Sequence, residues 1–261
     1  WVIEESRIRG GYNNTSVDFG AKAYIVEEEP QGTRRSNAII YSGIFNSRTG
    51  INRTNVFSVA EDITKAADPA NGSIQKLHAE DTNLNVFQEL KVSRALIDKD
   101  AIYAAEGGGT VTASNLVIGV IQPYAGKFGI SKNPESFASY GFRKYFSDVN
   151  NNSILRLSKD GLTEISNYGM KDFFRDELNA VTTNQLSGNI FGAYDIYGKD
   201  YVISMQNGEN FKTLNFDEKP SGWVSFFSYA PDQAFSLRNN FYTVKSIGGT
   251  ASINGAVTVE M

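Results

Sequence analysis

The sequence of 261 residues contains no cysteine and a single histidine, His78. Without cysteine, the chain can form no disulfide, no thiolate nucleophile and no cysteine-based zinc site. With one histidine, a histidine-rich metal site cannot be built within one chain, and a Ser-His-Asp triad has only one available base. The composition therefore argues against several common catalytic and metal-binding classes.

Long apolar runs are also lacking. A membrane-spanning helix needs about 18 or more apolar residues in succession, whereas the most apolar stretch is residues 116–121 (LVIGVI), which is typical of a buried strand. The chain begins at Trp1 without an initiator methionine. We therefore expect it to be a fragment, a processed product or an incomplete chain, so a targeting signal upstream is left open.

Positive charge is not in excess. The chain has 25 Lys and Arg against 29 Asp and Glu, a formal net charge of -4 and a pI near 5.2. Nucleic-acid-binding domains usually carry a basic surface, so this balance argues against one. The adjacent pair Arg34 and Arg35 lies between Gly32 and Ser36, as is typical of a solvated turn.

Aromatic residues, in contrast, are plentiful at 12%, and hydrophobic residues make up 41% of the chain. These values are those of an ordinary globular protein with a sizeable core. All-β domains often reach this length as a single unit.

Alternation of apolar and polar residues with a period of two predicts an all-β fold. Residues 139–146 lead into an Asn-rich turn at 148–152 and a second strand at 154–157, which indicates a hairpin. The Asp-Gly pair in the next turn, at 159–161, is a strong hairpin signal before residues 162–165. The same pattern is predicted for 191–197 with 201–205, 234–237 with 241–244, and 62–64 with 73–77, with further strands at 84–87 and 90–97.

The predicted turns at Asn151, Lys199 and Asn239 are 48 and 40 residues apart. Propeller blades of four strands repeat at about 40–50 residues, which would give the chain roughly five or six blades. We therefore predict a β-propeller-like repeat of short antiparallel strands. A β-sandwich or a jelly roll would also give short strands at such intervals.

One amphipathic helix is predicted near residues 168–181. Met170, Phe173, Phe174, Leu178 and Val181 recur at spacings of three and four, so they share one face. Asn167 is placed to cap the helix, and Asp172 lies near its positive start. We expect the helix to cover the edge of the sheet; the alternative is a docking helix for a neighbouring subunit.

Phosphate-binding and calcium-binding motifs are incomplete. Residues 107–109 (GGG) precede Thr110 without a Lys-Ser or Lys-Thr pair, and Gly126-Lys127 is followed by Phe128, so neither forms a phosphate-binding loop. Asp148, Asn150 and Asn152 alternate like calcium ligands, but the required Gly and Glu are replaced by Ser153 and Lys159. Residues 158–163 (SKDGLT) are similar to the Asp-box hairpin of sialidase-like propellers but lack its terminal aromatic residue.

Candidate groups for sugar chemistry are scattered. A glycosidase needs two carboxylates about 5–10 Å apart, and the sequence does not show which of its acidic residues converge. Trp223, Phe226, Phe227 and Tyr229 crowd one segment. We expect strand 223–227 to be buried on both faces; a sugar-binding platform is the competing interpretation. We expect His78 to be a partly exposed residue at a strand end, with a pH-sensitive or catalytic role as the alternative. The acidic candidates are Glu27–Glu29, Glu61, Asp62, Glu80, Asp81, Asp98, Asp100, Asp217 and Glu218.

Several segments carry a resemblance to a known group. They are residues 1–29 (WVIEESRIRGGYNNTSVDFGAKAYIVEEE), 71–103, 122–178 and 216–232; the densest is 122–137 (QPYAGKFGISKNPESF), followed by 155–161 (LRLSKDG). Together they resemble the tail stabilisation, nozzle or muzzle proteins of crAss-like and related tailed phages. The likeness spans residues 1–245 and ends before 246–261. It contains no catalytic motif from which residue roles could be transferred.

The resemblance implies a non-enzymatic virion component, assembled in the bacterial host cytoplasm as a ring of copies that contacts neighbouring tail or portal proteins. An acidic lumen would repel exiting DNA and let it slide during ejection. We predict one propeller-like domain over 1–245 and a separate strand or tail segment over 246–261. We expect no catalytic, cofactor-binding or metal-binding residues and no membrane segment. The alternatives are a receptor- or carbohydrate-binding β domain of a phage fibre or secreted protein, and a glycan-cleaving propeller.

Overall fold

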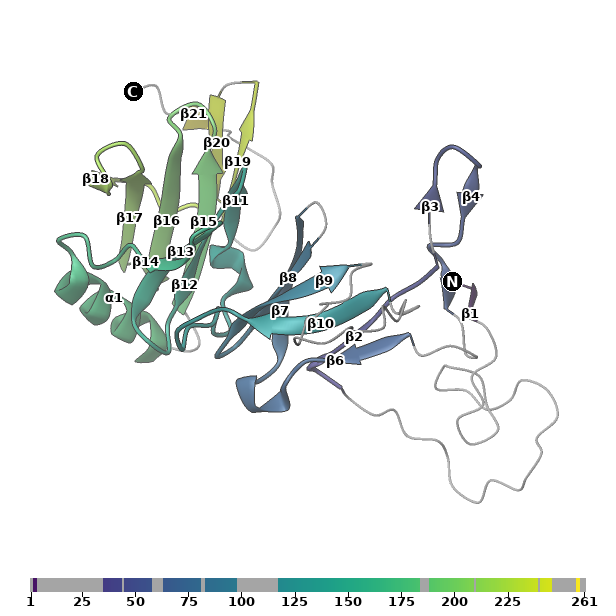
Figure 1. Ribbon diagram of the computed structural model, residues 1–261. Coiled ribbons are helices and arrows are strands. Elements are labelled where there is room, and N and C mark those ends of the chain that lie inside the picture. Colours follow the sequence, from purple (N-terminus) through teal and green to yellow (C-terminus); the bar gives the residue numbers. More distant parts are fainter. Residues whose placement is uncertain are drawn as a thin grey trace, which may run out of the picture. The chain divides into compact units, whose positions relative to one another are not determined.

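The computed structural model describes residues 2–3, 35–43, 45–57, 63–80, 83–97, 117–183, 188–208, 210–238, 240–245 and 257–258. This part of the chain is mostly β, as the alternating sequence predicts (Figure 1). It divides into two compact units, one with Trp1–Ile74 and Ala95–Ile121 and the other with Gln75–Arg94 and Gln122–Met261. The predicted boundary between residues 245 and 246 stays a prediction.

The first unit contains short paired strands. β1 (Val2–Ile3) pairs in parallel with β5 (Val56–Phe57). β3 (Phe45–Asn46) and β4 (Ile51–Asn52) form a small hairpin. β2 (Ala38–Ile40) pairs antiparallel with β6 (Thr64–Ala66), and a turn of 3-10 helix, η2 (Pro69–Asn71), follows.

The predicted pairing of 62–64 with 73–77 is therefore wrong. β6 pairs with β2, and β7 (Ile74–Glu80) belongs to another sheet. The connection between β6 and β7 contains Pro69 and a helical turn, which makes it too long for a tight hairpin. Asn37 ties β6 to β2, because its side-chain amide donates to the carbonyl of Ala67 at 2.7 Å.

Four successive sheets follow along the chain, and in each one neighbouring strands are consecutive in sequence. Sheet 1 has the order β10-β9-β8-β7, and its strands β9 and β10 run across the boundary between the two units. The strands of sheet 1 after β7 are β8 (Asn83–Gln88), β9 (Val92–Ile97) and β10 (Ile118–Pro123).

The other three sheets lie in the second unit, and their strands are antiparallel. Sheet 2 comprises β11 (Ala138–Tyr140), β12 (Arg143–Asp148), β13 (Ser153–Ser158) and β14 (Gly161–Glu164). Sheet 3 comprises β15 (Gly188–Asp195), β16 (Asp200–Asn207), β17 (Asn210–Asp217) and β18 (Gly222–Phe227). Sheet 4 comprises β19 (Gln233–Leu237), β20 (Asn240–Val244) and β21 (Val257–Thr258).

The hairpins predicted within sheets 2, 3 and 4 are confirmed, but the single strand predicted for residues 139–146 is wrong. The chain turns at Gly141 (φ 56°), so this stretch forms two strands, β11 and β12, which pair antiparallel with each other. The turns of the confirmed hairpins use residues with a positive φ, namely Asn152 at 53°, Gly161 at 106°, Lys199 at 65° and Arg238 at 49°. Glycine adopts this conformation readily and asparagine tolerates it, which explains the turn signals at Asn152 and Gly161. Lys199 and Arg238 adopt it without an intrinsic preference.

Aromatic and aliphatic side chains pack between neighbouring sheets. On β12, Tyr145 belongs to the core between sheets 2 and 3, whereas the next residue, Phe146, belongs to the core between sheets 1 and 2. On β13, Ile154 and Leu155 divide in the same way. Successive side chains of a strand point to opposite faces, so sheet 2 is buried on both sides.

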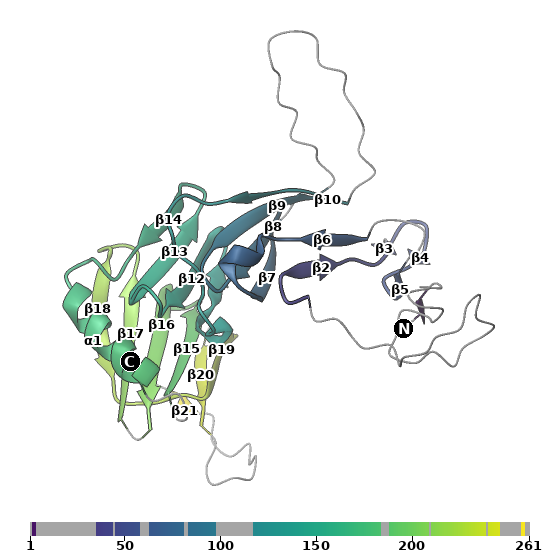
Figure 2. The same ribbon diagram turned by 90° about the horizontal axis from the view of Figure 1, so that it is seen from below.

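The helix is present but begins later than predicted. α1 spans Lys171–Thr183, because residues 166–169 form a turn that ends at Gly169 with φ of 78°. Asn167 lies within this turn and is not the N-cap. Phe174, Leu178 and Val181 are buried as predicted, and α1 contacts β13, β15 and β16, which matches the expected covering helix (Figure 2).

Strand β18 differs from the prediction of burial on both faces. Val224 and Phe226 are 56% and 60% exposed, while Trp223 packs against the core. β18 is an edge strand of sheet 3, and although the ring of Phe226 lies 5.6 Å from that of Phe173 in α1, the face that carries Val224 and Phe226 stays largely exposed. Among the described strands, no closed barrel or closed ring of sheets is formed.

Candidate functional site

The candidate site is a hollow in the second unit with a volume of about 620 Å³. It is lined by residues from the first strand of each of the four sheets. These are Lys76 of β7, Ala138 and Ser139 of β11, Phe191–Tyr194 of β15 and Gln233–Ser236 of β19, together with Glu135, Phe137, Ile196 and Asp232 from the connections. The hollow therefore lies where four segments far apart in the sequence converge.

A close backbone contact fixes one wall of the hollow. A Cβ atom on Gly192 would lie 2.0 Å from the carbonyl oxygen of Ser136 and 2.8 Å from the hydroxyl oxygen of Tyr201. Only glycine allows this approach. Tyr201 donates a hydrogen bond to the same carbonyl at 2.7 Å, so β15 and β16 are held against the loop that precedes β11.

A stack of tyrosine rings supports the same wall. The ring of Tyr194, which lines the hollow, lies 4.5 Å from that of Tyr140 at an interplanar angle of 8°. Tyr145 follows at 5.8 Å from Tyr194, and Tyr201 lies 4.9 Å from Tyr145. The hydroxyl of Tyr194 donates to the carbonyl of Lys199 at 2.8 Å. These contacts leave Tyr194 little rotational freedom.

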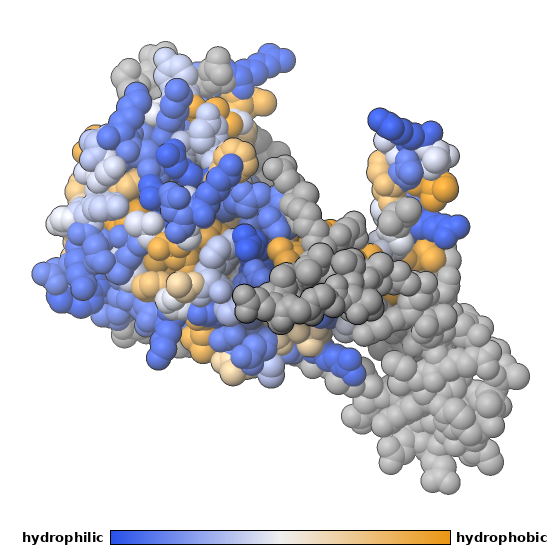
Figure 3. All heavy atoms as spheres, viewed as in Figure 1, coloured by the Kyte–Doolittle hydropathy of each residue, from blue (hydrophilic) through white to orange (hydrophobic). Residues whose placement is uncertain are grey.

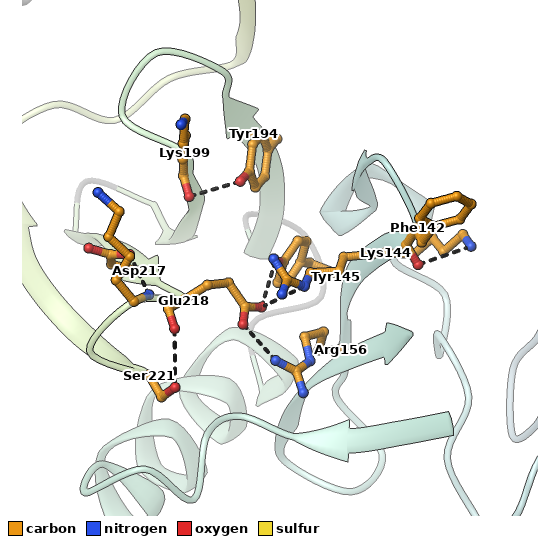
Figure 4. A network of polar contacts seen from close by, with 11 residues as sticks. Phe142, Lys144, Tyr145, Arg156, Tyr194, Lys199, Asp217, Glu218 and Ser221 are labelled. Carbon is orange, nitrogen blue, oxygen red and sulfur yellow. Dashed lines mark hydrogen bonds and ion pairs between the residues drawn. The ribbon is translucent and has the colours of Figure 1, made fainter. Parts of the chain in front are cut away.

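The stack is anchored by Glu218, which follows β17 (Figure 4). Its carboxylate accepts hydrogen bonds from the Tyr145 hydroxyl at 2.7 Å and from the Arg156 guanidinium at 2.6 Å. Arg143 lies 3.9 Å from it. Burial and the hydrogen bond to Glu218 raise the pKa of Tyr145 above its ordinary value, so this tyrosine acts as a neutral hydrogen-bond donor.

A second ionic cluster joins β7 to β12. Lys76 places its ammonium 5.4 Å from the ring centre of Phe137. Lys144 of β12 is only 2% exposed and forms an ion pair with Glu80 of β7. Burial alone would raise the pKa of Glu80, but the hydrogen bonds from Lys144 and Asn85 outweigh it and hold the pKa below its ordinary value.

His78 lies within β7 and not at its end. It is partly buried, as expected, and its ring centre lies 5.2 Å from that of Phe137. Burial, followed by the charge of Lys144, lowers the pKa of His78, so the ring is neutral at physiological pH. Its packing against Phe137 supports a structural role at this position.

The alternating residues Asp148, Asn150 and Asn152 form a turn. Asp148 is fully buried, and its carboxylate accepts hydrogen bonds from the Gly129 amide at 3.0 Å and the Ser131 hydroxyl at 2.9 Å. The side-chain amide of Asn151 donates to it at 2.6 Å. Both carboxylate oxygens of Asp148 are therefore hydrogen-bonded within the protein. Within the described ranges, no three His, Asp or Glu residues group as metal ligands.

The structure places the other sequence candidates apart. Glu80 and Glu218 belong to the two ionic clusters, and Asp217 accepts from the Lys219 amide at 2.8 Å. Trp223 packs 4.5 Å from Phe174 and donates to the Ile165 carbonyl at 3.1 Å, so its ring is not open for a sugar. Outside the described residues lie Arg34, residues 27–29, 61–62 and 107–109, and Asp81, Asp98 and Asp100.

The lining of the hollow combines aromatic faces with hydroxyl, amide and carboxylate groups, and no histidine is among its described residues. Such a set binds ligands through non-covalent contacts. The sequence analysis did not identify Phe191, Gln233 and Phe235 as site residues. What they share is that each lies in the first strand of a sheet, and this is known only once the fold is known.

The sequence matches no protein-family model, and no curated protein matches it at a significant level. No helix in the described part of the chain is long and apolar enough to cross a membrane.

Proposed function

We propose that this chain is a structural subunit of a bacteriophage tail, of the nozzle, muzzle or tail stabilisation type, whose work is to fit against copies of itself and neighbouring tail proteins. In this proposal, its sheets are blades of a propeller-like repeat, and the subunits surround part of the channel for DNA ejection. The sequence resemblance over residues 1–245 suggests this role.

The observation that carries the proposal is the order of the sheets. Four sheets follow one another along the chain, each built from consecutive strands, and their first strands line one hollow. In a propeller, the inner strand of every blade lines a central channel in this way. Shared cores on both faces of sheet 2 supply the stiffness that a channel wall needs.

The net charge of the chain is compatible with the proposed role in a phage tail. A net charge of -4 gives no general affinity for the DNA backbone, so a lumen built from such subunits would let DNA slide past. Contacts around a closed ring are heterologous, with different surfaces of each subunit meeting.

The test is the assembly state of the full chain, measured by mass photometry over a range of concentrations and imaged by negative-stain electron microscopy. We expect ring-shaped oligomers, alone or with co-expressed portal and tail proteins from the same genome. Exclusively monomeric protein that binds none of those neighbours would contradict the proposal. Portal and capsid genes beside its reading frame would support it independently.

The alternative is a receptor- or carbohydrate-binding domain of a phage fibre or a secreted protein. A sugar platform at residues 223–229 is the competing interpretation of that segment in the sequence. In the structure, Trp223 packs against α1 and donates to the Ile165 carbonyl, and Phe227 stacks on Tyr229 at 5.2 Å. A glycan-cleaving propeller remains a third possibility; it requires that substitution of a single Asp or Glu abolish sugar release without unfolding the domain.

A further inference from the structure

The hollow between the first strands has the size of a ligand pocket. Its volume of about 620 Å³ falls within the range of roughly 300–1,000 Å³ that small-molecule sites occupy. All of its lining residues belong to the second unit, so the pocket is complete within that unit.

Its chemistry selects against charged and purely apolar ligands. Lys76 is the cation of the described lining, and Glu135 and Asp232 are its carboxylates. A phosphate or another anion would meet more negative than positive charge here. An apolar ligand such as a lipid chain would offer no hydrogen-bonding group to Gln233 or Glu135.

The lining suits a ring that is apolar on its faces and polar at its rim. Phe235 is 48% exposed although it is aromatic, and it lines the hollow with Phe191. Aromatic faces cover the C–H face of a sugar ring, while Gln233 and Glu135 can accept hydrogen bonds from its hydroxyl groups. Figure 3 shows one face of the molecule, on which hydrophobic residues lie scattered among hydrophilic ones.

The walls are already fixed, which reduces the entropy lost on binding. The Ser236 hydroxyl donates to the Tyr194 carbonyl at 3.0 Å and accepts from the Ile196 amide at 3.1 Å. The ring of Phe235 stacks on Tyr242 at 5.5 Å. The hydrogen bonds of Ser236 thereby tie β19 directly to the end of β15.

We propose that this hollow is a carbohydrate-binding site for a neutral saccharide, with Phe235 as its stacking face and Gln233 and Glu135 as hydrogen-bonding groups. The site does not depend on the proposed tail role, because a monomer already contains every lining residue.

The test is binding of the full chain to a glycan array and to glucose, galactose, N-acetylglucosamine and their neutral oligosaccharides, followed by saturation-transfer NMR. We expect saturable binding that Phe235→Ala weakens by about tenfold or more, since each tenfold corresponds to about 1.4 kcal/mol of lost contact. Phe226→Ala is the matched control, because Phe226 is an aromatic residue on β18 that is 60% exposed and is not among the residues lining the hollow.

Two further variants keep the test independent of folding. Ser139→Trp adds a ring to an exposed position of β11 that lines the hollow, and it should block binding without touching the core. Gln233→Ala, also at an exposed position, should weaken binding and leave the thermal unfolding midpoint unchanged. Absence of saturable binding to any neutral saccharide, binding only of acidic glycans, or binding that survives Phe235→Ala and Ser139→Trp would overturn the proposal.

Discussion

Lys144 is the most unusual single residue of the fold, because a lysine that is 2% exposed carries a charge into the interior. Its ammonium pairs with Glu80 of β7 and lies 3.4 Å from the carbonyl of Phe142. Burying an ammonium without such partners would be very costly. The pair therefore acts as an obligatory link between sheets 1 and 2.

Replacing Glu80 with glutamine should lower the free energy of unfolding by about 3 kcal/mol, because a buried charge is left without its counter-ion. The pKa of Glu80 is lowered in the folded protein, so its contribution is present at neutral pH and is lost as the pH falls through its folded-state pKa. Urea unfolding at several pH values measures both effects.

Asp172→Asn is the control for Glu80→Gln. Its pair with Arg175 has the same chemistry, at 2.7 Å, but the Asp172 side chain is 84% exposed. An exposed pair contributes little to stability, so a loss in Asp172→Asn equal to that in Glu80→Gln would refute the importance assigned to burial.

The pKa of Asp200 is shifted in the opposite direction to that of Glu80. Asp200 lies between Asp195 and Asp217 in the register of sheet 3. Burial, together with the charges of these two aspartates, raises its pKa, although the hydrogen bond from Asn215 opposes the shift. A raised folded-state pKa means that ionised Asp200 destabilises the fold at neutral pH, and that protonation relieves this as the pH falls.

Asp200→Asn should therefore raise the free energy of unfolding at neutral pH, because like charges directly opposite each other on strands are destabilising; we expect a gain of the order of a cross-strand pair, about 0.2–1 kcal/mol. The gain should shrink as the pH falls through the acidic range, where wild-type Asp200 takes up a proton. Thermal unfolding followed at pH 7 and pH 4 separates the two conditions. Asp160→Asn, at an exposed turn, should show no such pH-dependent gain.

At the scale of elements, α1 depends on its aromatic face. Phe174 is fully buried, and its ring lies 4.5 Å from Trp223 and 5.3 Å from Phe173. The rest of the helix is largely charged, and a helix of this length has little stability of its own in water. Packing on sheet 3 is thus what holds α1 in place.

Phe174→Ala should lower the free energy of unfolding by about 3–5 kcal/mol, because it removes a large buried ring and leaves a cavity. Trp223 fluorescence during urea unfolding reports the change directly, since its indole is in contact with the deleted ring. Arg175→Ala changes the next residue along the helix, whose side chain is 53% exposed, and should destabilise the fold far less than Phe174→Ala. Similar losses for both variants would show that the apolar face is not what anchors the helix.

Elements set by local chemistry were predictable from the sequence. The hairpins around Asn152 and Gly161 follow from turn residues that accept a positive φ, and the buried face of α1 follows from its spacing. The start of α1 was missed because the turn ending at Gly169 takes the positions before it. The pairing of β6 with β2 was missed because it joins strands across a long connection, for which local patterns carry no signal.

The candidate site was less predictable than the fold. Phe191 and Phe235 are separated by an entire sheet in sequence, and they line one hollow because β15 and β19 are the first strands of adjacent sheets. The role of Gly192 could not be predicted from the sequence, because it depends on the close approach of the Ser136 carbonyl, which lies far from it along the chain. The sequence pointed to residues 223–229 as the possible binding platform, whereas the stacking of the sheets brings other aromatic residues, Phe191 and Phe235, to one hollow.

At the scale of the whole molecule, the described strands of the second unit differ in how completely the surrounding sheets and helix bury their side chains. β12, β13 and β16 are almost entirely buried, whereas β14 and β18 are edge strands with partly exposed residues. An amide in a doubly covered strand exchanges only when a large part of the unit opens, whereas an edge strand can open by itself.

Hydrogen-deuterium exchange followed by mass spectrometry should therefore give the slowest exchange for peptides covering β12, β13 and β16, slower by more than about tenfold than peptides covering β14 and β18. The comparison of β13 with β14 is the most informative, because the two strands pair directly and share hydrogen bonds but differ in burial. The comparison is made between the amides that hydrogen-bond across β13 and β14; if hydrogen bonding alone set their protection, these amides would exchange at the same rate in both strands. That result would contradict the view that sheet-on-sheet packing gives this protein its rigidity, and it would also remove the physical basis for treating the sheets as parts of a stiff channel wall.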